Sequence, residues 1–71
     1  MKEQLIQYLE MEYRATQIGL ANSLNKCITV QNAIQRCLGA AQIVQGMGIT
    51  YEEAAMIFEE HKNKLTDLLN E

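Results

Sequence analysis

The amino-acid sequence predicts an all-α protein, either a small three-helix bundle or a helical hairpin with a third helix packed across it. The 71 residues include no proline and only four glycines, so the strongest interrupters of a helix are rare. Apolar residues recur at three- and four-residue steps in three segments, which is the pattern of an amphipathic helix. A chain this short has material for one hydrophobic core. We therefore expect a single domain over residues 1–71, with helices at about 2–24, 29–46 and 50–70.

The first predicted helix, residues 2–24, carries apolar residues on two sides. The main stripe consists of Leu5, Ile6, Leu9, Tyr13, Thr16, Leu20 and Leu24. A weaker stripe on roughly the opposite side consists of Tyr8, Met11, Ala15 and Ile18. A helix needs one apolar stripe to reach the core of a small bundle, so a second stripe indicates a second packing partner. We therefore predict that the weaker stripe is an interface.

The second predicted helix, residues 29–46, is expected to be the most buried. Four polar residues gather before it and predict a short turn, with Thr29 as the N-cap; they are Asn22, Ser23, Asn25 and Lys26. Its apolar positions cover a broad arc and are Val30, Ala33, Ile34, Cys37, Leu38, Ala40, Ala41 and Val44. Arg36 is the only charged residue of the segment. The small side chains, together with Gly39, would let another helix approach closely.

The third predicted helix, residues 50–70, has the clearest start. Gly46 and Gly48 are placed to end the preceding helix in the left-handed conformation. Thr50 and Glu53 form the pattern of a capping box, flanked by the apolar pair Ile49 and Ala54. The predicted buried face consists of Tyr51, Ala54, Ile57, Phe58, His61, Leu65, Leu68 and Leu69. The opposite face is acidic, so we expect this helix to form an outer wall.

Charge and terminal sequence restrict location and partners. Nine carboxylates against six Lys and Arg give a small acidic protein of net charge −3, which disfavours nucleic acid as a partner. Met1 is followed by the charged residues Lys2 and Glu3 rather than by the apolar stretch of a signal peptide. No segment approaches the ~20 apolar residues of a membrane span, so we expect no membrane contact and a cytoplasmic location. Cys27 and Cys37 lack CxxC spacing and are expected to be free thiols.

We predict no catalytic, cofactor-binding or metal-binding residues. His61 is the single histidine and lies on the apolar face of its helix, where a packing role is the simplest interpretation. The Glu-x-x-His spacing of di-iron bundles is absent, because Phe58 stands three residues before His61. A weak enzyme that combines Cys27 or Cys37 with His61 remains a third hypothesis.

A glycine turn, an apolar residue and a threonine cap stand between Val44 and Ile57. Over about twenty residues this spacing resembles a helix-turn-helix unit, which implies a DNA-binding regulator as an alternative function. Glu52 and Glu53 would then face the phosphates with negative charge, and the first cation of the helix is Lys62.

The favoured function is therefore a non-enzymatic adaptor, regulator or inhibitor that acts through protein–protein interaction. A core this small seldom contributes more than about 3–5 kcal/mol of stability by itself. Since the first helix carries surplus apolar surface, we expect the protein to form a homodimer, and we also expect it to contact a protein partner.

Overall fold

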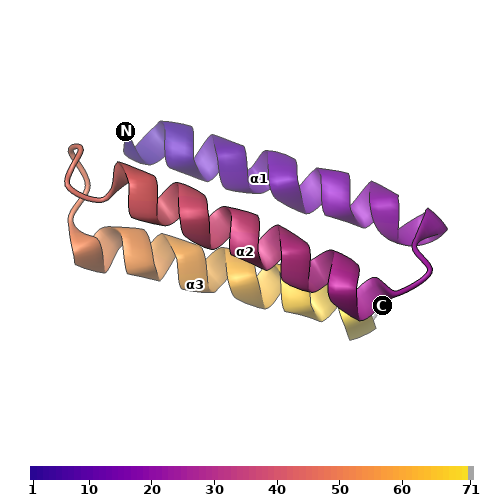
Figure 1. The fold of residues 1–71 in the computed structure, drawn as a ribbon. Coiled ribbons are helices and arrows are strands. Elements are labelled where there is room, and N and C mark those ends of the chain that lie inside the picture. Colours follow the sequence, from indigo (N-terminus) through magenta and orange to yellow (C-terminus); the bar gives the residue numbers. More distant parts are fainter. Residues whose placement is uncertain (71) are drawn as a thin grey trace.

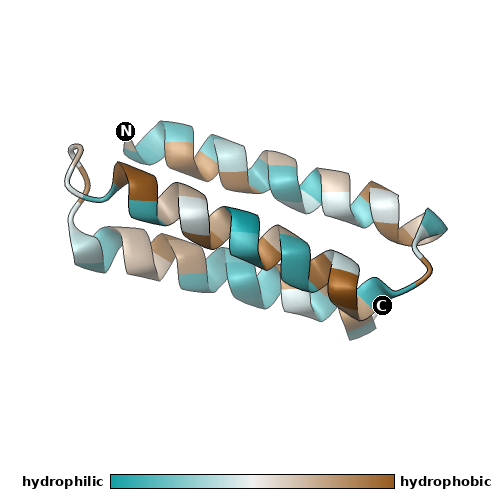
Figure 2. Cartoon of the chain, viewed as in Figure 1, coloured by the Kyte–Doolittle hydropathy of each residue, from teal (hydrophilic) through white to brown (hydrophobic). Residues whose placement is uncertain are grey.

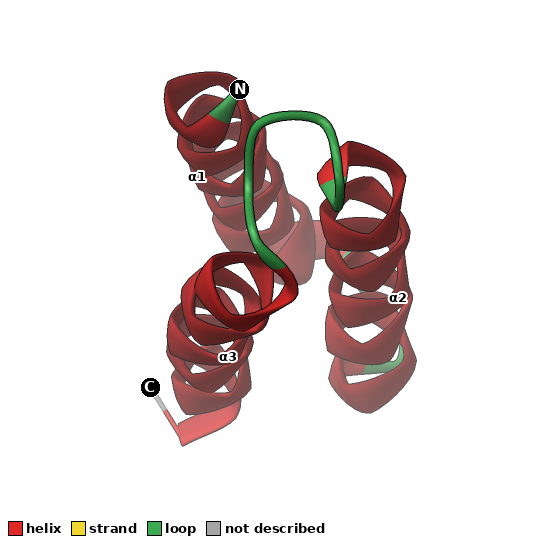
Figure 3. Ribbon diagram, turned by 90° about the vertical axis from the view of Figure 1, so that its left-hand side faces the viewer, coloured by secondary structure: helices red, strands yellow, loops and turns green. Residues whose placement is uncertain are grey.

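Three helices pack side by side in the computed structural model, which describes residues 1–70 (Figure 1). They are α1 (Lys2–Gly19), α2 (Lys26–Val44) and α3 (Tyr51–Asp67), and single 3₁₀ turns follow α1 (Leu20–Asn22) and α3 (Leu68–Asn70). α1 and α3 run in the same direction, and α2 runs in the opposite one. An end-on view places the three helices around a common centre (Figure 3). The all-α class and the three-helix bundle are thus confirmed.

The start of α2 differs from the prediction, which placed the N-cap at Thr29. The cap is Asn25, whose backbone is extended and whose side-chain oxygen accepts a hydrogen bond from the Ile28 N–H at 3.1 Å. Thr29 lies inside the first turn, and its hydroxyl donates to the Asn25 carbonyl. Asparagine is a stronger N-cap residue than threonine, which favours the start at Asn25. The cap of α3 agrees with the prediction, since the Thr50 hydroxyl accepts from the Glu53 N–H at 3.1 Å.

Replacing Asn25 by alanine should lower the free energy of unfolding by about 1 kcal/mol, because the N–H groups at the start of α2 lose their side-chain acceptor. Urea denaturation followed by circular dichroism measures this loss. Asn63 is the matched control, because it is exposed and lies within α3, away from a helix start. Equal losses from Asn63→Ala and Asn25→Ala would contradict the assignment of the cap.

The turn between α2 and α3 is built on two glycines. Gly46 and Gly48 have φ angles of 84° and 91°, the left-handed region that only glycine adopts at little cost. The Gly46 N–H donates to the Ile49 carbonyl at 3.1 Å, which closes the loop, and Ile49 is buried beneath it. α2 ends at Val44 rather than at the predicted residue 46, because Gln45 already has an extended backbone.

The core runs along the bundle axis between all three helices. Its buried apolar residues are Leu5, Leu9, Leu20, Val30, Ala33, Cys37, Ala41, Ile49, Ala54, Ile57, Leu65 and Leu68. Three residues of the predicted faces are exposed instead: Leu24 fully, Tyr51 to 68% and Leu69 to 37%. The three- and four-residue spacing places residues on one face only while the chain is helical. Leu24 lies beyond the end of the helix, because it follows Ser23, where the backbone is extended. Tyr51 and Leu69 stand at the two ends of the α3 segment, where a neighbouring helix covers less of the surface.

Candidate interaction surface

Charged side chains are unevenly distributed around the bundle. The seam between α1 and α3 is bridged by an ion pair of Lys2 with Glu53 at 3.8 Å and by the Lys64 ammonium, 5.1 Å from the centre of the Tyr13 ring. On the chain between Lys26 and Glu52, by contrast, the only charged residue is Arg36. This stretch includes nearly all of α2. The bundle therefore has a charged side at α1 and α3 and a nearly uncharged side at α2.

The outer side of α2 carries one continuous row of uncharged residues, which we call the α2 crest. It consists of Ile28, Asn32, Gln35, Gly39 and Ile43. Steps of three and four residues place these positions on one face, opposite the residues that α2 buries in the core. The row spans about 22 Å at 1.5 Å per residue. Ile28 is 53% and Ile43 is 72% exposed, and Figure 2 shows hydrophobic colour at both ends of α2 with hydrophilic residues between them.

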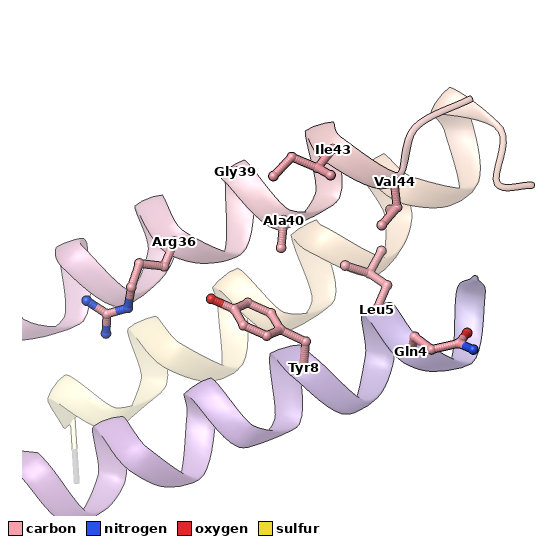
Figure 4. A pocket seen from close by; sticks show the side chains of 8 residues that line it. All are labelled: Gln4, Leu5, Tyr8, Arg36, Gly39, Ala40, Ile43 and Val44. Carbon is pink, nitrogen blue, oxygen red and sulfur yellow. The ribbon is translucent and has the colours of Figure 1, made fainter. Parts of the chain in front are cut away.

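An open apolar groove of about 440 Å³ lies beside the crest, between α1 and α2 (Figure 4). Its lining residues are Gln4, Leu5, Tyr8, Arg36, Gly39, Ala40, Ile43 and Val44. The Tyr8 ring extends from α1 toward α2, and Ile43 stands on the opposite wall. Gly39 and Ala40 add little side-chain bulk, so the groove stays open between these two larger side chains. Aromatic and aliphatic walls of this kind suit an apolar side chain from another protein.

Arg36 introduces the one positive charge of the groove. Its Nε donates a hydrogen bond of 2.7 Å to Oε2 of Glu12, on the neighbouring helix. The Glu12 side chain is 16% exposed and that of Arg36 is 53% exposed. The guanidinium is therefore compensated within the chain. A separation of 24 residues hides this pair from helix-periodicity arguments, which compare residues three or four apart.

The four residues predicted as an interface are all exposed, but the structure brings only one of them to the groove. Tyr8, 39% exposed, lines it. Met11 lies instead in a separate shallow hollow of α1 that also contains the charged residues Glu10 and Arg14. Ala15 and Ile18 are exposed further along α1, outside the groove.

Sequence reasoning missed Ile28 and Ile43 as surface residues of interest, and it named Gly39 only as a small residue that would let another helix approach closely. The sequence did contain a signal for an exposed apolar surface, because these positions fall outside the apolar arc that α2 buries. A solvated helix normally carries charged residues opposite its buried face, and α2 lacks them there.

The groups that could carry chemistry lie apart from this groove. His61 is only 7% exposed; its Nδ1 lies 3.0 Å from the Ile57 carbonyl and therefore carries the proton, while its buried Nε2 has no hydrogen-bond partner within the described chain. Cys37 is fully buried, and burial, aided by the Glu12 charge and opposed by Arg36, raises the pKa of its thiol to about 11. Cys27 is an exposed free thiol. Within residues 1–70, no group of three or more His, Cys, Asp or Glu is placed to hold a metal ion.

No helix in the described part of the chain combines the length and hydrophobicity of a membrane span. Comparison of the chain with protein-family models, with curated proteins and with solved structures found no match. These comparisons therefore assign no role to the α2 crest or to the groove.

Proposed function

We propose that this protein is a non-enzymatic helical interaction module that self-associates through the α2 crest and the adjoining groove, and acts as an adaptor, regulator or inhibitor. The observation that most supports this proposal is that the outer side of α2 is uncharged and partly apolar. Protein interfaces are depleted of charged residues at their centre and enriched in tyrosine and other aromatic residues. Tyr8 and Ile43 give this surface two large exposed anchors on either side of an open groove.

The total exposed area is sufficient for one interface of standard size. The chain exposes 4916 Å², whereas a monomeric protein of this mass typically exposes about 4500 Å². The extents of 38 × 16 × 16 Å account for the excess, because an elongated bundle has more surface per volume. An interface of standard size takes about 800 Å² from each partner, or about a sixth of the surface here.

The two other functional hypotheses receive less support from the geometry. In a helix-turn-helix unit the second helix crosses the first at a large angle, whereas α3 runs back alongside α2 (Figures 1 and 3). The exposed start of α3 carries Glu52 and Glu53, which repel phosphate. For cysteine chemistry at Cys37, a thiol whose pKa is raised to about 11 stays protonated at neutral pH, and the thiolate is the nucleophile.

A lysine in place of Ile43 tests the proposal. The wild-type protein should sediment as a dimer at tens of micromolar, and Ile43→Lys should weaken the dimer at least tenfold, because the new charge would be desolvated without a partner. The matched control is Met56→Lys: Met56 is 66% exposed, close to the 72% of Ile43, but lies on the outer side of α3.

Circular dichroism should show that both variants stay helical. A wild-type monomer at these concentrations would contradict the proposal, as would equal weakening by the two lysines.

A further inference from the structure

We infer that the groove between α1 and α2 is a docking site for an amphipathic helix of another protein, which presents apolar side chains to the groove and one carboxylate to Arg36. This inference rests on the proposed role as an interaction module and names the chemistry of a partner. Because the proposed self-association uses the same groove, the partner helix and a second copy compete for it.

The groove has the form that a fourth helix requires. Both of its walls are helices, and no residue of α3 lines it, so it opens on the side of α1 and α2 that α3 leaves uncovered (Figure 3). The lining positions on α2 recur at steps of three and four residues along one face; they are Arg36, Gly39, Ala40, Ile43 and Val44. A groove of this kind accepts a helix whose own apolar anchors recur at the same steps.

Arg36 gives this apolar groove a hydrogen-bonding end. Its Nε is bound to Glu12 at 2.7 Å, but its two Nη groups have no acceptor within residues 1–70. A guanidinium carries five N–H donors, so it can bind a second carboxylate while it keeps the first. The Arg36 side chain is 53% exposed and that of Glu12 only 16%, so an approaching partner meets the cation.

The charges around the groove favour a carboxylate over an ammonium group. Arg36 is the only charged residue among the described residues that line the groove, and the chain has no acidic residue between Glu12 and Glu52. A partner lysine beside Arg36 would be repelled, whereas a carboxylate there would be attracted. One exposed cation is also too few for the several phosphate contacts on which binding of nucleic acid depends. The favoured partner is therefore a protein helix with an acidic residue.

The length of the groove sets the spacing on the partner helix. Figure 4 shows the Arg36 guanidinium at one end of the groove, with Ile43 and Val44 toward the other end. Arg36 and Ile43 are seven residues apart, which corresponds to about 10 Å along α2. A helix that lies along the groove should therefore carry its carboxylate about two turns from its apolar anchor.

Selection from displayed helical peptides tests this inference. A library of alanine-rich peptides of about twenty residues, varied along one face, is selected for binding to the wild-type chain and against binding to Ile43→Lys. The selected peptides should carry a large apolar residue and, about two turns away, aspartate or glutamate. At saturation such a peptide should shift the wild-type dimer to a monomer with one bound peptide.

A double-mutant cycle assigns the carboxylate to Arg36. In fluorescence anisotropy, a selected peptide with glutamate should bind the wild-type chain about three- to tenfold more tightly than the same peptide with glutamine. This advantage should vanish in Arg36→Gln, because the donors of the guanidinium are gone. It should persist in Arg14→Gln, the matched control, because Arg14 is an exposed arginine outside the groove.

Three outcomes would overturn the inference: no peptide that distinguishes the wild-type chain from Ile43→Lys, selected peptides without an acidic preference, or an advantage of glutamate that survives Arg36→Gln. Each of them leaves the proposed self-association intact, because self-association is measured on the chain alone. A wild-type monomer that binds the peptide would contradict the self-association alone. A dimer that keeps its size with peptide bound would overturn the competition for the groove.

Discussion

Leu9→Ala should lower the free energy of unfolding by about 3 kcal/mol, within the range of about 2–5 kcal/mol that applies to leucine truncation in a core. Leu9 is fully buried and lies in the cluster that joins the three helices. The loss combines the transfer free energy of the removed methyl groups with the cavity that they leave. Small domains are often stable by only about 5 kcal/mol, so this change should remove more than half of the stability. Denaturant titration monitored by circular dichroism measures it.

Leu24→Ala is the matched control for this experiment. Both leucines belong to the main apolar stripe predicted for the first helix, but Leu24 is fully exposed and should change the stability by less than about 0.5 kcal/mol. Both variants must be compared at one protein concentration, because self-association makes the apparent stability depend on it. A large loss from Leu24→Ala would show that a partner surface covers this residue, or that the turn after α1 is packed differently.

Alkaline pH should destabilise the protein through Cys37. The pKa of its thiol is raised from 9.0 to about 11 in the folded state, so above pH 9 the unfolded chain loses this proton while the folded chain keeps it. The contribution of the buried Cys37 thiol to the free energy of unfolding is therefore fully present below pH 9 and is lost as the pH rises toward 11. Since each pKa unit corresponds to about 1.4 kcal/mol, the total loss should reach about 2–3 kcal/mol. Stability measured by denaturant titration from pH 8 to 11 tests this.

Lysine and tyrosine side chains also titrate at alkaline pH, so the comparison with cysteine variants isolates the thiol. Cys37→Ala should be less stable at pH 8 but should lose less stability than the wild type between pH 9 and 11. Cys27→Ala is the matched control, because it removes a thiol that lies outside the core. Parallel profiles of Cys37→Ala and the wild type would rule out the buried thiol as the cause.

Local features of the fold were predictable because they depend on residues close together in sequence. The capping pair of Thr50 with Glu53 and the left-handed glycines at 46 and 48 fall within single turns of the chain. The start of α2 was predicted wrongly at Thr29, although asparagine is the stronger N-cap residue and Asn25 is the cap that the structure uses. Leu24 was placed in the core because the stripe was extended past the point where the helix ends.

The candidate surface was less predictable, since it combines residues of two helices. The exposed stripe on α1 could be found by its period, but only Tyr8 of this stripe lines the groove. The opposite wall of the groove is formed by Gly39 and Ile43 of α2, a helix that the sequence indicated to be mostly buried. The pairing of Arg36 with Glu12 likewise depends on how the two helices align.

Apolar periodicity and turn residues by themselves determined that the chain forms three helices, where the last of them begins, and which small residues, such as Cys37, enter the core. These are consequences of the repeat of the α-helix and of backbone preferences, which act over a few residues. Only the tertiary structure decided which exposed apolar residues share one face, because that depends on the rotation and alignment of each helix against its neighbours. The packing of α1 against α2 thus joins Tyr8 to Ile43 across a groove, and leaves Met11 on a separate surface among charged residues.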